Sequence, residues 1–244
     1  MKKIITLAVA LNVAACFAVG AFDDAGGYVE VLPKDAGHFV FCNSQQGVPA
    51  ADIQKVIGLL HHYFHVDIRL ASGDAPTVSG VQDALKSFKA KGAIWIVSDA
   101  HLPLVLAATE NQWAFINVFP VLADSPDEKT RKDRMACLIL RTFASIHGVG
   151  AAYMMPACVM NPAVGIKGLD ALTFKDYSPE AIDKVQKYLL GYLGYKAALR
   201  GSYEDACIDG WAPQPTNSVQ KAIWDKVHAM PTQPIKILPE SQRK

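Results

Sequence analysis

The chain has 244 residues, with 24 Lys and Arg against 23 Asp and Glu and a net charge of +1 when the histidines are neutral. This balance argues against a nucleic-acid or anionic-membrane partner, because both require a clustered positive surface. The length and the 51% hydrophobic content are sufficient for one sizeable core.

Residues 1–21 are typical of a secretory signal peptide. Two lysines precede an apolar run, and small residues lead to a cleavage site after Ala21. A lipoprotein signal with Cys16 as the lipidated residue is the alternative. Asn12 interrupts the apolar run, which is shorter than a bilayer-spanning helix, so we expect no membrane span. The sequence therefore predicts an exported protein, periplasmic or secreted, with a mature net charge of about −1 because the signal contains two lysines and no acidic residue.

The cysteines beyond the signal are even in number, which permits disulfides in an exported protein. They are Cys42, Cys137, Cys158 and Cys207. Sequence alone does not choose among their pairings, and a free cysteine in the core at Cys137 is an alternative. None of the spacings is of the C-x-x-C type, so they do not predict a zinc site.

The first half of the mature chain alternates between extended and helical patterns. Extended segments are expected at 25–33, 38–43, 66–70, 92–98 and 112–119, and helices at 49–64 and 81–89. His61 and His65 are four residues apart in the first helix, which is a ligand spacing. No carboxylate accompanies them, so we expect a helix end that faces solvent rather than a metal site.

A long helix is predicted to follow. Ser125 is a suitable N-cap, Pro126 suits the first helical position, and Glu128 completes a capping box. Apolar side chains recur at helical spacing at Met135, Leu138, Ile139, Thr142, Phe143, Ile146 and Val149. Gly148 and Gly150 then end the helix, because glycine adopts the left-handed cap conformation at little steric cost.

A histidine, a glycine and a methionine follow one another at defined spacings from the end of this helix onward. His147 is followed by Gly150 and, further on, by the run Cys158-Val159-Met160-Asn161. This order resembles the zinc helix and Met-turn of the metzincin metallopeptidases, and the C-V-M-N run is most similar to the archaemetzincins. That family has H-E-x-x-H-x-x-G-x-x-H before its Met-turn. Two histidines four residues apart on a helix can share one zinc ion, and the glutamate activates the zinc-bound water.

Most of the chemistry-bearing residues of this motif are absent. With His147 at the middle ligand position, Phe143 stands in place of the first histidine, Ala144 in place of the glutamate and Tyr153 in place of the third histidine. The spacing from Tyr153 to the methionine of the turn is also one residue shorter than in archaemetzincins. The relic-site positions are Phe143, Ala144, His147, Gly150, Tyr153 and Met160.

The resemblance therefore implies a pseudopeptidase, with no catalytic residue and no cofactor expected. His147 and Tyr153 are the remaining candidates for a metal contact, but catalytic zinc has three protein ligands. An active zinc peptidase with an atypical ligand set is the alternative function, and a purely structural role is a third. The residues alone also allow an unrelated amphipathic helix that ends in glycine, with His147 as a satisfied helix-end histidine whose partial charge suits the helix dipole.

The implied fold is α/β (α+β): a metzincin-like mixed twisted sheet with two backing helices, a long central helix, a Met-turn and a small helical lower subdomain. In metzincins an edge strand holds the substrate backbone. By resemblance, residues 112–119 or a neighbouring segment would be that edge and would bind a peptide or protein. Coverage of the edge by the chain's own loops is the alternative.

A further helix is expected at 178–193, with Ser178 as its cap, and a short one at 218–230 in a proline-rich tail. The tail has no counterpart in the family. We therefore divide the chain into three parts: a signal peptide at 1–21, a metzincin-like domain at 22–194 and a C-terminal extension at 195–244. The oligomeric state is left open.

Overall fold

The computed structural model describes residues 26–44, 48–150, 158–173 and 175–230. The signal peptide predicted at 1–21, the lipidation candidate Cys16 and the third-ligand position Tyr153 lie outside these residues, so the structure does not test them. The chain forms two compact units, of which the larger spans Leu32–Leu199 and the smaller combines the N-terminal segment up to Val31 with the chain from Arg200 onward.

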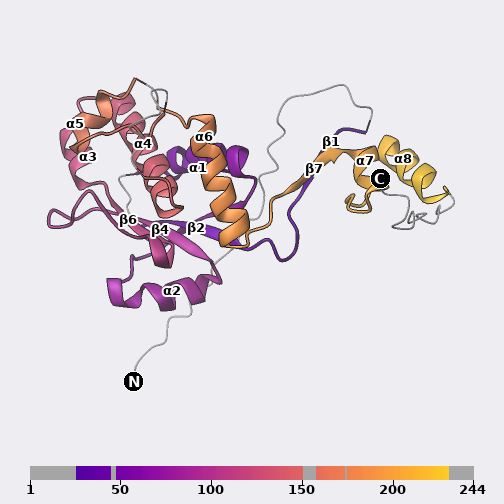
Figure 1. The fold of residues 1–244 in the computed structure, drawn as a ribbon, viewed down its shortest axis with the longest axis horizontal. Helices are drawn as coiled ribbons and strands as arrows, with labels where there is room; N and C mark the ends of the chain where they lie inside the picture. The colour runs from indigo at the N-terminus through magenta and orange to yellow at the C-terminus, as the bar shows by residue number, and fades with distance from the viewer. Residues whose placement is uncertain (1–25, 45–47, 151–157, 174, 231–244) are drawn as a thin grey trace, which may run out of the picture. The chain divides into compact units, whose positions relative to one another are not determined.

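The larger unit is built on a five-stranded mixed sheet (Figure 1). Its strands are β2 (His38–Asn43), β3 (Asp67–Ser72), β4 (Gly92–Val97), β5 (Val105–Ala108) and β6 (Trp113–Asn117). They are arranged in the order β3-β2-β4-β6-β5. The first four are parallel, and β5 runs antiparallel to β6 at one edge. The mixed sheet expected from the sequence is confirmed.

Alternation along the buried strand β4 divides the core between the two faces of the sheet. Ile94 and Ile96 point to the face covered by α1 (Ala50–Phe64) and α4 (Glu128–Ile146). Trp95 and Val97 point to the other face, which α2 (Val81–Phe88) covers. Figure 1 shows α2 on one side of the strands and α1 with α4 on the other. Strand β4 is apolar along its whole length because a central parallel strand is buried on both faces.

The edge of the sheet differs from the expectation for residues 112–119. Residues 113–117 form β6, which pairs with β4 on one side and β5 on the other, so the edge is not this segment but its neighbour, which the expectation also allowed. The neighbour β5 is the edge strand, and the sequence analysis did not identify it as a strand. It is only four residues long, too short for a clear alternation of apolar and polar side chains.

The start of the long helix is also corrected. Asp127, not Ser125, is the N-cap of α4, and its carboxylate accepts a hydrogen bond from the backbone N–H of Thr130. Ser125 instead ends the short helix α3 (Phe119–Asp124), where its hydroxyl donates to the carbonyl oxygen of Val121. Asp and Ser are nearly equal as N-caps. The sequence alone could not show that Ser125 is the C-cap of the preceding helix α3.

Behind α4 the larger unit continues with helices. They are α5 (Gly165–Asp170), α6 (Pro179–Gln186) and the π-helical turn η3 (Lys187–Tyr192). The predicted cap Ser178 is confirmed, since its hydroxyl accepts from the N–H of Ala181. The helix expected at 178–193 is thus present, but its second half widens into a π-turn, which is a feature often found at functional sites.

The smaller unit contains a two-stranded sheet of β1 (Tyr28–Val31) and β7 (Leu199–Ser202) together with α7 (Tyr203–Ile208) and α8 (Ser218–His228). The Gln220 side chain, on α8, donates to the carbonyl oxygen of Gly26. The helix predicted at 218–230 is confirmed. The expected division at residues 194 and 195 did not anticipate that a strand near the N-terminus pairs with one from the tail.

The four cysteines beyond the predicted signal are free and buried. Burial raises the pKa of the Cys42 and Cys137 thiols to about 11, so both behave as inert core side chains at neutral pH. None of the helices in the described part of the chain is long and apolar enough to cross a bilayer.

Candidate functional site at the end of helix α4

His147 lies at the C-terminal end of α4 and is completely buried. Its Nδ1 is 2.7 Å from the carbonyl oxygen of Phe143, one turn earlier in the helix. A carbonyl oxygen only accepts, so Nδ1 holds the proton and Nε2 keeps its lone pair. Nε2 has no hydrogen-bond partner among the described residues. Burial lowers the pKa of His147 to about 3, so this imidazole is neutral and carries no charge for the helix dipole.

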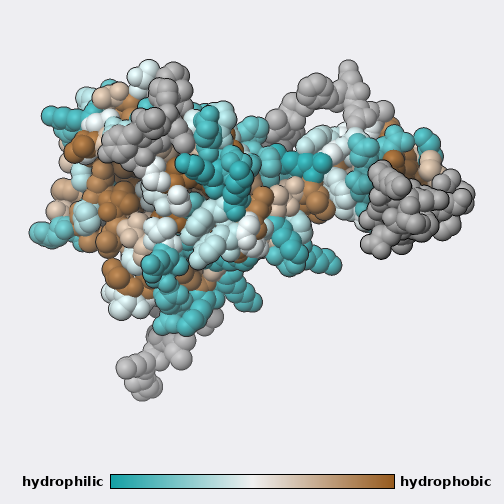
Figure 2. Space-filling model, in the orientation of Figure 1, coloured by the Kyte–Doolittle hydropathy of each residue, from teal (hydrophilic) through white to brown (hydrophobic). Residues whose placement is uncertain are grey.

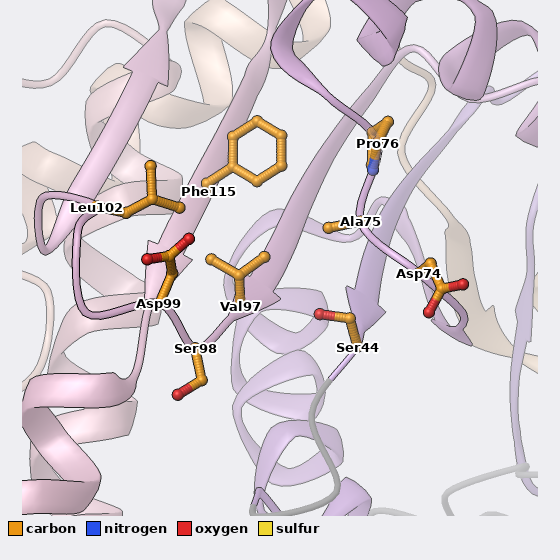
Figure 3. Close-up of a pocket in the computed structure, with 9 residues that line it drawn as sticks. All are labelled: Ser44, Asp74, Ala75, Pro76, Val97, Ser98, Asp99, Leu102 and Phe115. Atoms are coloured by element: carbon orange, nitrogen blue, oxygen red, sulfur yellow. The ribbon is translucent and has the colours of Figure 1, made fainter.

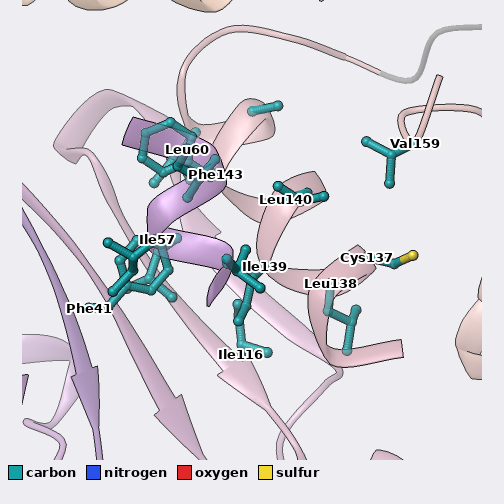
Figure 4. Close-up of a cluster of buried hydrophobic side chains, with 14 of the residues drawn as sticks. Phe41, Ile57, Leu60, Ile116, Cys137, Leu138, Ile139, Leu140, Phe143 and Val159 are labelled. Carbon is teal, nitrogen blue, oxygen red and sulfur yellow. The ribbon is translucent and has the colours of Figure 1, made fainter. Parts of the chain in front are cut away.

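Aromatic rings surround this imidazole. The ring of Phe143 is 4.3 Å from that of His147, centroid to centroid, and the rings of Phe39 and Tyr188 are 5.5 Å and 6.2 Å away. Phe143 itself packs edge-on to Phe39 and stacks on Phe64 of α1 at 5.5 Å. Figure 4 shows Phe143 near Leu60 of α1, inside the cluster between the sheet and the helices α1 and α4. The position of the first metzincin ligand is thus part of the hydrophobic core.

The other relic positions on the helix end have no donor group. Ala144 is completely buried, and its carbonyl oxygen accepts from the backbone N–H groups of His147 and Val149. Gly148 adopts a positive φ of 80° and ends the helix, as predicted. A Cβ on Gly148 would lie 3.0 Å from the Tyr188 ring, so glycine here also permits close packing. A Cβ on Gly150 would meet no described residue within 4 Å, so the described part of the chain does not place the same constraint there.

Tyr188 connects this region to the sheet. Its hydroxyl oxygen accepts a hydrogen bond of 3.2 Å from Nε2 of Gln112, the residue before β6. Its ring packs against Gly148, the residue after His147. The ring of Tyr192 is 5.0 Å away, centroid to centroid. Sequence analysis did not identify Tyr188, because its contacts come from segments far apart in the chain.

The turn that contains Met160 packs alongside α4. Nη1 of Arg141, on α4, donates to the carbonyl oxygens of Val159 and Asn161 at 2.5 Å and 2.6 Å. Met160 is buried, and its N–H lies 3.4 Å from the Sγ of Cys158. This turn and the helix end therefore belong to one core, held together by a half-buried arginine that sequence analysis did not single out.

The donor groups that the structure describes around His147 are fewer than a catalytic zinc ion requires. Of the described relic positions, only His147 has a nitrogen or oxygen side-chain atom that could bind a metal. That atom is Nε2, which keeps its lone pair. No group of three His, Cys, Asp or Glu side chains within residues 26–44, 48–150, 158–173 and 175–230 could hold a metal. Catalytic zinc needs three protein ligands, and the rings around His147 offer none.

Solved structures of archaeal peptidases are among those similar to this fold. An archaemetzincin from Methanopyrus kandleri has a TM-score of 0.50 at 13% identity, over 65% of this chain and 99% of its own. A zinc-dependent peptidase from Methanocorpusculum labreanum has a TM-score of 0.46 at 13% identity, over 61% and 100%. An archaemetzincin from Archaeoglobus fulgidus has a TM-score of 0.44 at 12% identity, over 60% and 99%.

The chain has an archaemetzincin-like fold. The similarity to the Methanopyrus kandleri protein concerns the fold alone, since the identity is only 13%. The sequence matches no protein-family model and no curated protein. The function must therefore be argued from the residues of this chain.

Strand β5, which contacts α4, lies at an edge of the sheet, and no described strand pairs with its outer side. The N–H of Asn117 donates to the carbonyl oxygen of Leu104, so these two residues form a hydrogen-bonded antiparallel pair. Such pairs alternate with pairs whose backbone groups point outward. By this register, the N–H and C=O groups of Val105 and Ala107 point away from β6. No residue in the described part of the chain bonds to them.

A polar hollow of the larger unit lies elsewhere. It has a volume of about 350 Å³ at the carboxyl ends of β2 and β4, on the face that α2 covers (Figure 3). Figure 3 shows Val97 and Phe115 facing Ser44 and Asp74 across the opening. The Ser44 hydroxyl donates to Ile96 at 2.6 Å, and Asp99 accepts from the N–H of His101. This pocket contains none of the relic positions.

Proposed function

We propose that this chain is a non-catalytic protein that binds an extended peptide along the open edge of β5. The single observation that carries this proposal is the outward direction of the backbone groups of Val105 and Ala107. A peptide strand laid beside them would complete the hydrogen bonds that β5 leaves open. The shared fold supports a role in binding a polypeptide chain, and the apolar surroundings of His147 support the loss of catalysis.

The side chains of β5 favour this use of the edge. Val105 packs against the core on the α4 side, and Leu106 packs on the α2 side. Ala107 is exposed and small, so it would not obstruct an approaching backbone. The strand has no charge, proline or bulge, the devices that usually protect an edge from further pairing.

Substitution of Ala107 tests whether a peptide binds by backbone hydrogen bonds to the edge of β5. Ala107→Pro removes the outward N–H but leaves the β5–β6 hydrogen bonds of Leu106 and Ala108 intact. The probe is an immobilised library of random unmodified heptapeptides. We expect binding by the wild type, loss of binding by Ala107→Pro and retention by the control Ala107→Ser, with no peptide cleaved. Equal binding by Ala107→Pro, in a variant with unchanged thermal unfolding, would overturn the proposal.

The alternative is an active zinc peptidase with an atypical ligand set. One observation favours it: Nδ1–H of His147 is held by a carbonyl oxygen while Nε2 keeps its lone pair, and this is the tautomer of a metal-ligating histidine. The alternative requires further donors beyond the described residues, such as Tyr153. Cleavage of the heptapeptide library, abolished by His147→Ala, would support it.

We also propose that the protein is exported through the predicted signal at residues 1–21. The intact mass of the mature protein tests this. A chain that begins near Phe22 supports simple cleavage, a lipidated chain that begins at Cys16 supports a lipoprotein, and an uncleaved chain contradicts export by either route.

A further inference from the structure

An apolar groove lies between α3 and α5, away from the relic site. It has a volume of about 460 Å³ and is lined by Pro120, Ala123, Asp124, Val164, Gly165, Ile166 and Lys167. The Val164 side chain on its rim is 91% exposed, and Phe119 beside it is 45% exposed. In Figure 2, hydrophobic side chains gather on the surface where Figure 1 labels α3. Clustered exposure of this kind usually marks an interaction surface rather than scattered apolar residues.

A buried arginine braces both walls of the groove. Arg134 of α4 makes a two-pronged ion pair with Asp170 of α5, with bonds of 2.9 Å and 2.6 Å. Its Nη1 also donates to the carbonyl oxygen of Asp124 at the end of α3. Because one rigid guanidinium holds the ends of both helices, the groove exists before any partner arrives. A preformed surface loses less conformational entropy on binding.

The charges at the groove have opposite signs on its two walls. Asp124 stands on the α3 wall with its side chain 56% exposed, although Arg134 lies 3.7 Å from its carboxylate. Lys167 stands on the α5 wall, also exposed, and no described residue forms an ion pair with it. A surface with one acid and one base on opposite sides of an apolar centre is complementary to itself after a two-fold rotation. The net charge of +1 adds little long-range repulsion between copies.

We propose that the groove between α3 and α5 is a self-association surface whose partner is a second copy of this chain. In the two-fold dimer, Val164 of each copy enters the groove of the other, and Asp124 of each faces Lys167 of the other. A strongly charged partner would gain no net electrostatic attraction from a groove that carries one acid and one base. The inference is independent of the peptide edge at β5, because no residue of that strand lines the groove.

Analytical ultracentrifugation of the full chain tests the dimer. We expect the mean mass to rise toward twice the monomer mass over a range from about 1 to 100 µM protein. Val164→Asp buries an unpaired charge in the interface and should weaken dimerisation by about tenfold or more. The matched control is Val78→Asp, because Val78 is also more than half exposed but lies before α2, and it should leave dimerisation unchanged.

A charge exchange gives a second, independent readout. Lys167→Asp places two acids opposite each other in the dimer and should weaken it, and adding Asp124→Lys should restore much of the loss. Thermal unfolding of each variant shows whether it is folded. A wild type that stays monomeric up to about 100 µM, or equal effects of Val164→Asp and Val78→Asp, would overturn the proposal, as would a folded double variant that recovers nothing.

Discussion

The ring of Phe143 lies 4.3 Å from the imidazole of His147, four residues later on α4. In a metzincin these two positions hold the paired histidines of the zinc helix, since residues four apart lie above one another on one face. Here the first side chain joins a cluster with Phe39 and Phe64, and the second is left neutral within it. The side chains at both positions therefore lie in apolar surroundings.

The buried imidazole predicts a pH dependence of stability. The unfolded chain protonates His147 below its ordinary pKa of 6.5, whereas the folded chain resists protonation until about pH 3. Stability is therefore complete above pH 6.5 and falls as the pH drops toward 3. The loss from this residue should amount to about 2 to 3 kcal/mol at pH 4.5. Urea unfolding between pH 7.5 and pH 4.5 measures it.

The variant His147→Leu isolates this contribution. Its free energy of unfolding should fall less between pH 7.5 and 4.5 than that of the wild type. His38, whose pKa is also lowered by burial, remains in both proteins and contributes equally to each. Identical pH profiles for the two proteins would mean that His147 is accessible to protons in the folded state.

Phe143 should behave as a core residue. Phe143→Ala removes a completely buried ring and is expected to lower the free energy of unfolding by about 3 to 5 kcal/mol. Phe119→Ala, at a half-exposed position, should cost less than about 1 kcal/mol. Denaturant titrations of both variants provide the comparison. A small effect of Phe143→Ala would place its ring in an open cleft instead.

Arg141 should hold the turn that contains Met160. Arg141→Met removes the guanidinium that donates to the carbonyl oxygens of Val159 and Asn161 and should cost about 1 to 3 kcal/mol. Hydrogen exchange at residues 158–161 should accelerate more than elsewhere. Arg131→Met, at a half-buried position near the start of the same helix, is the control. Unchanged exchange in Arg141→Met would show that the turn is held by its apolar contacts alone.

The sequence predicted most of the sheet because its central strands are unambiguous. The run from Gly92 to Val97 is apolar throughout, and only a strand buried on both faces requires that composition. The short strand β5 was missed, and the sequence did not decide whether residues 112–119 or a neighbouring segment form the edge, because order across a sheet depends on contacts between distant segments.

The site was predicted in part. The motif places His147, Phe143 and Ala144 at one helix end, as local spacing allows. It could not indicate that Tyr188 packs against Gly148 or that Arg141 binds the turn, because both contacts depend on how the chain folds back. Nor could spacing reveal that His147 is fully buried, which is what keeps it neutral.

The zinc content of the purified chain tests the central claim most directly. After incubation with excess zinc and gel filtration, elemental analysis should find less than about 0.1 zinc ion per chain, the same for the wild type and His147→Ala, because a single imidazole is too weak a site to retain the ion. About one zinc ion per wild-type chain, lost in His147→Ala, would contradict the account and identify a working metal site.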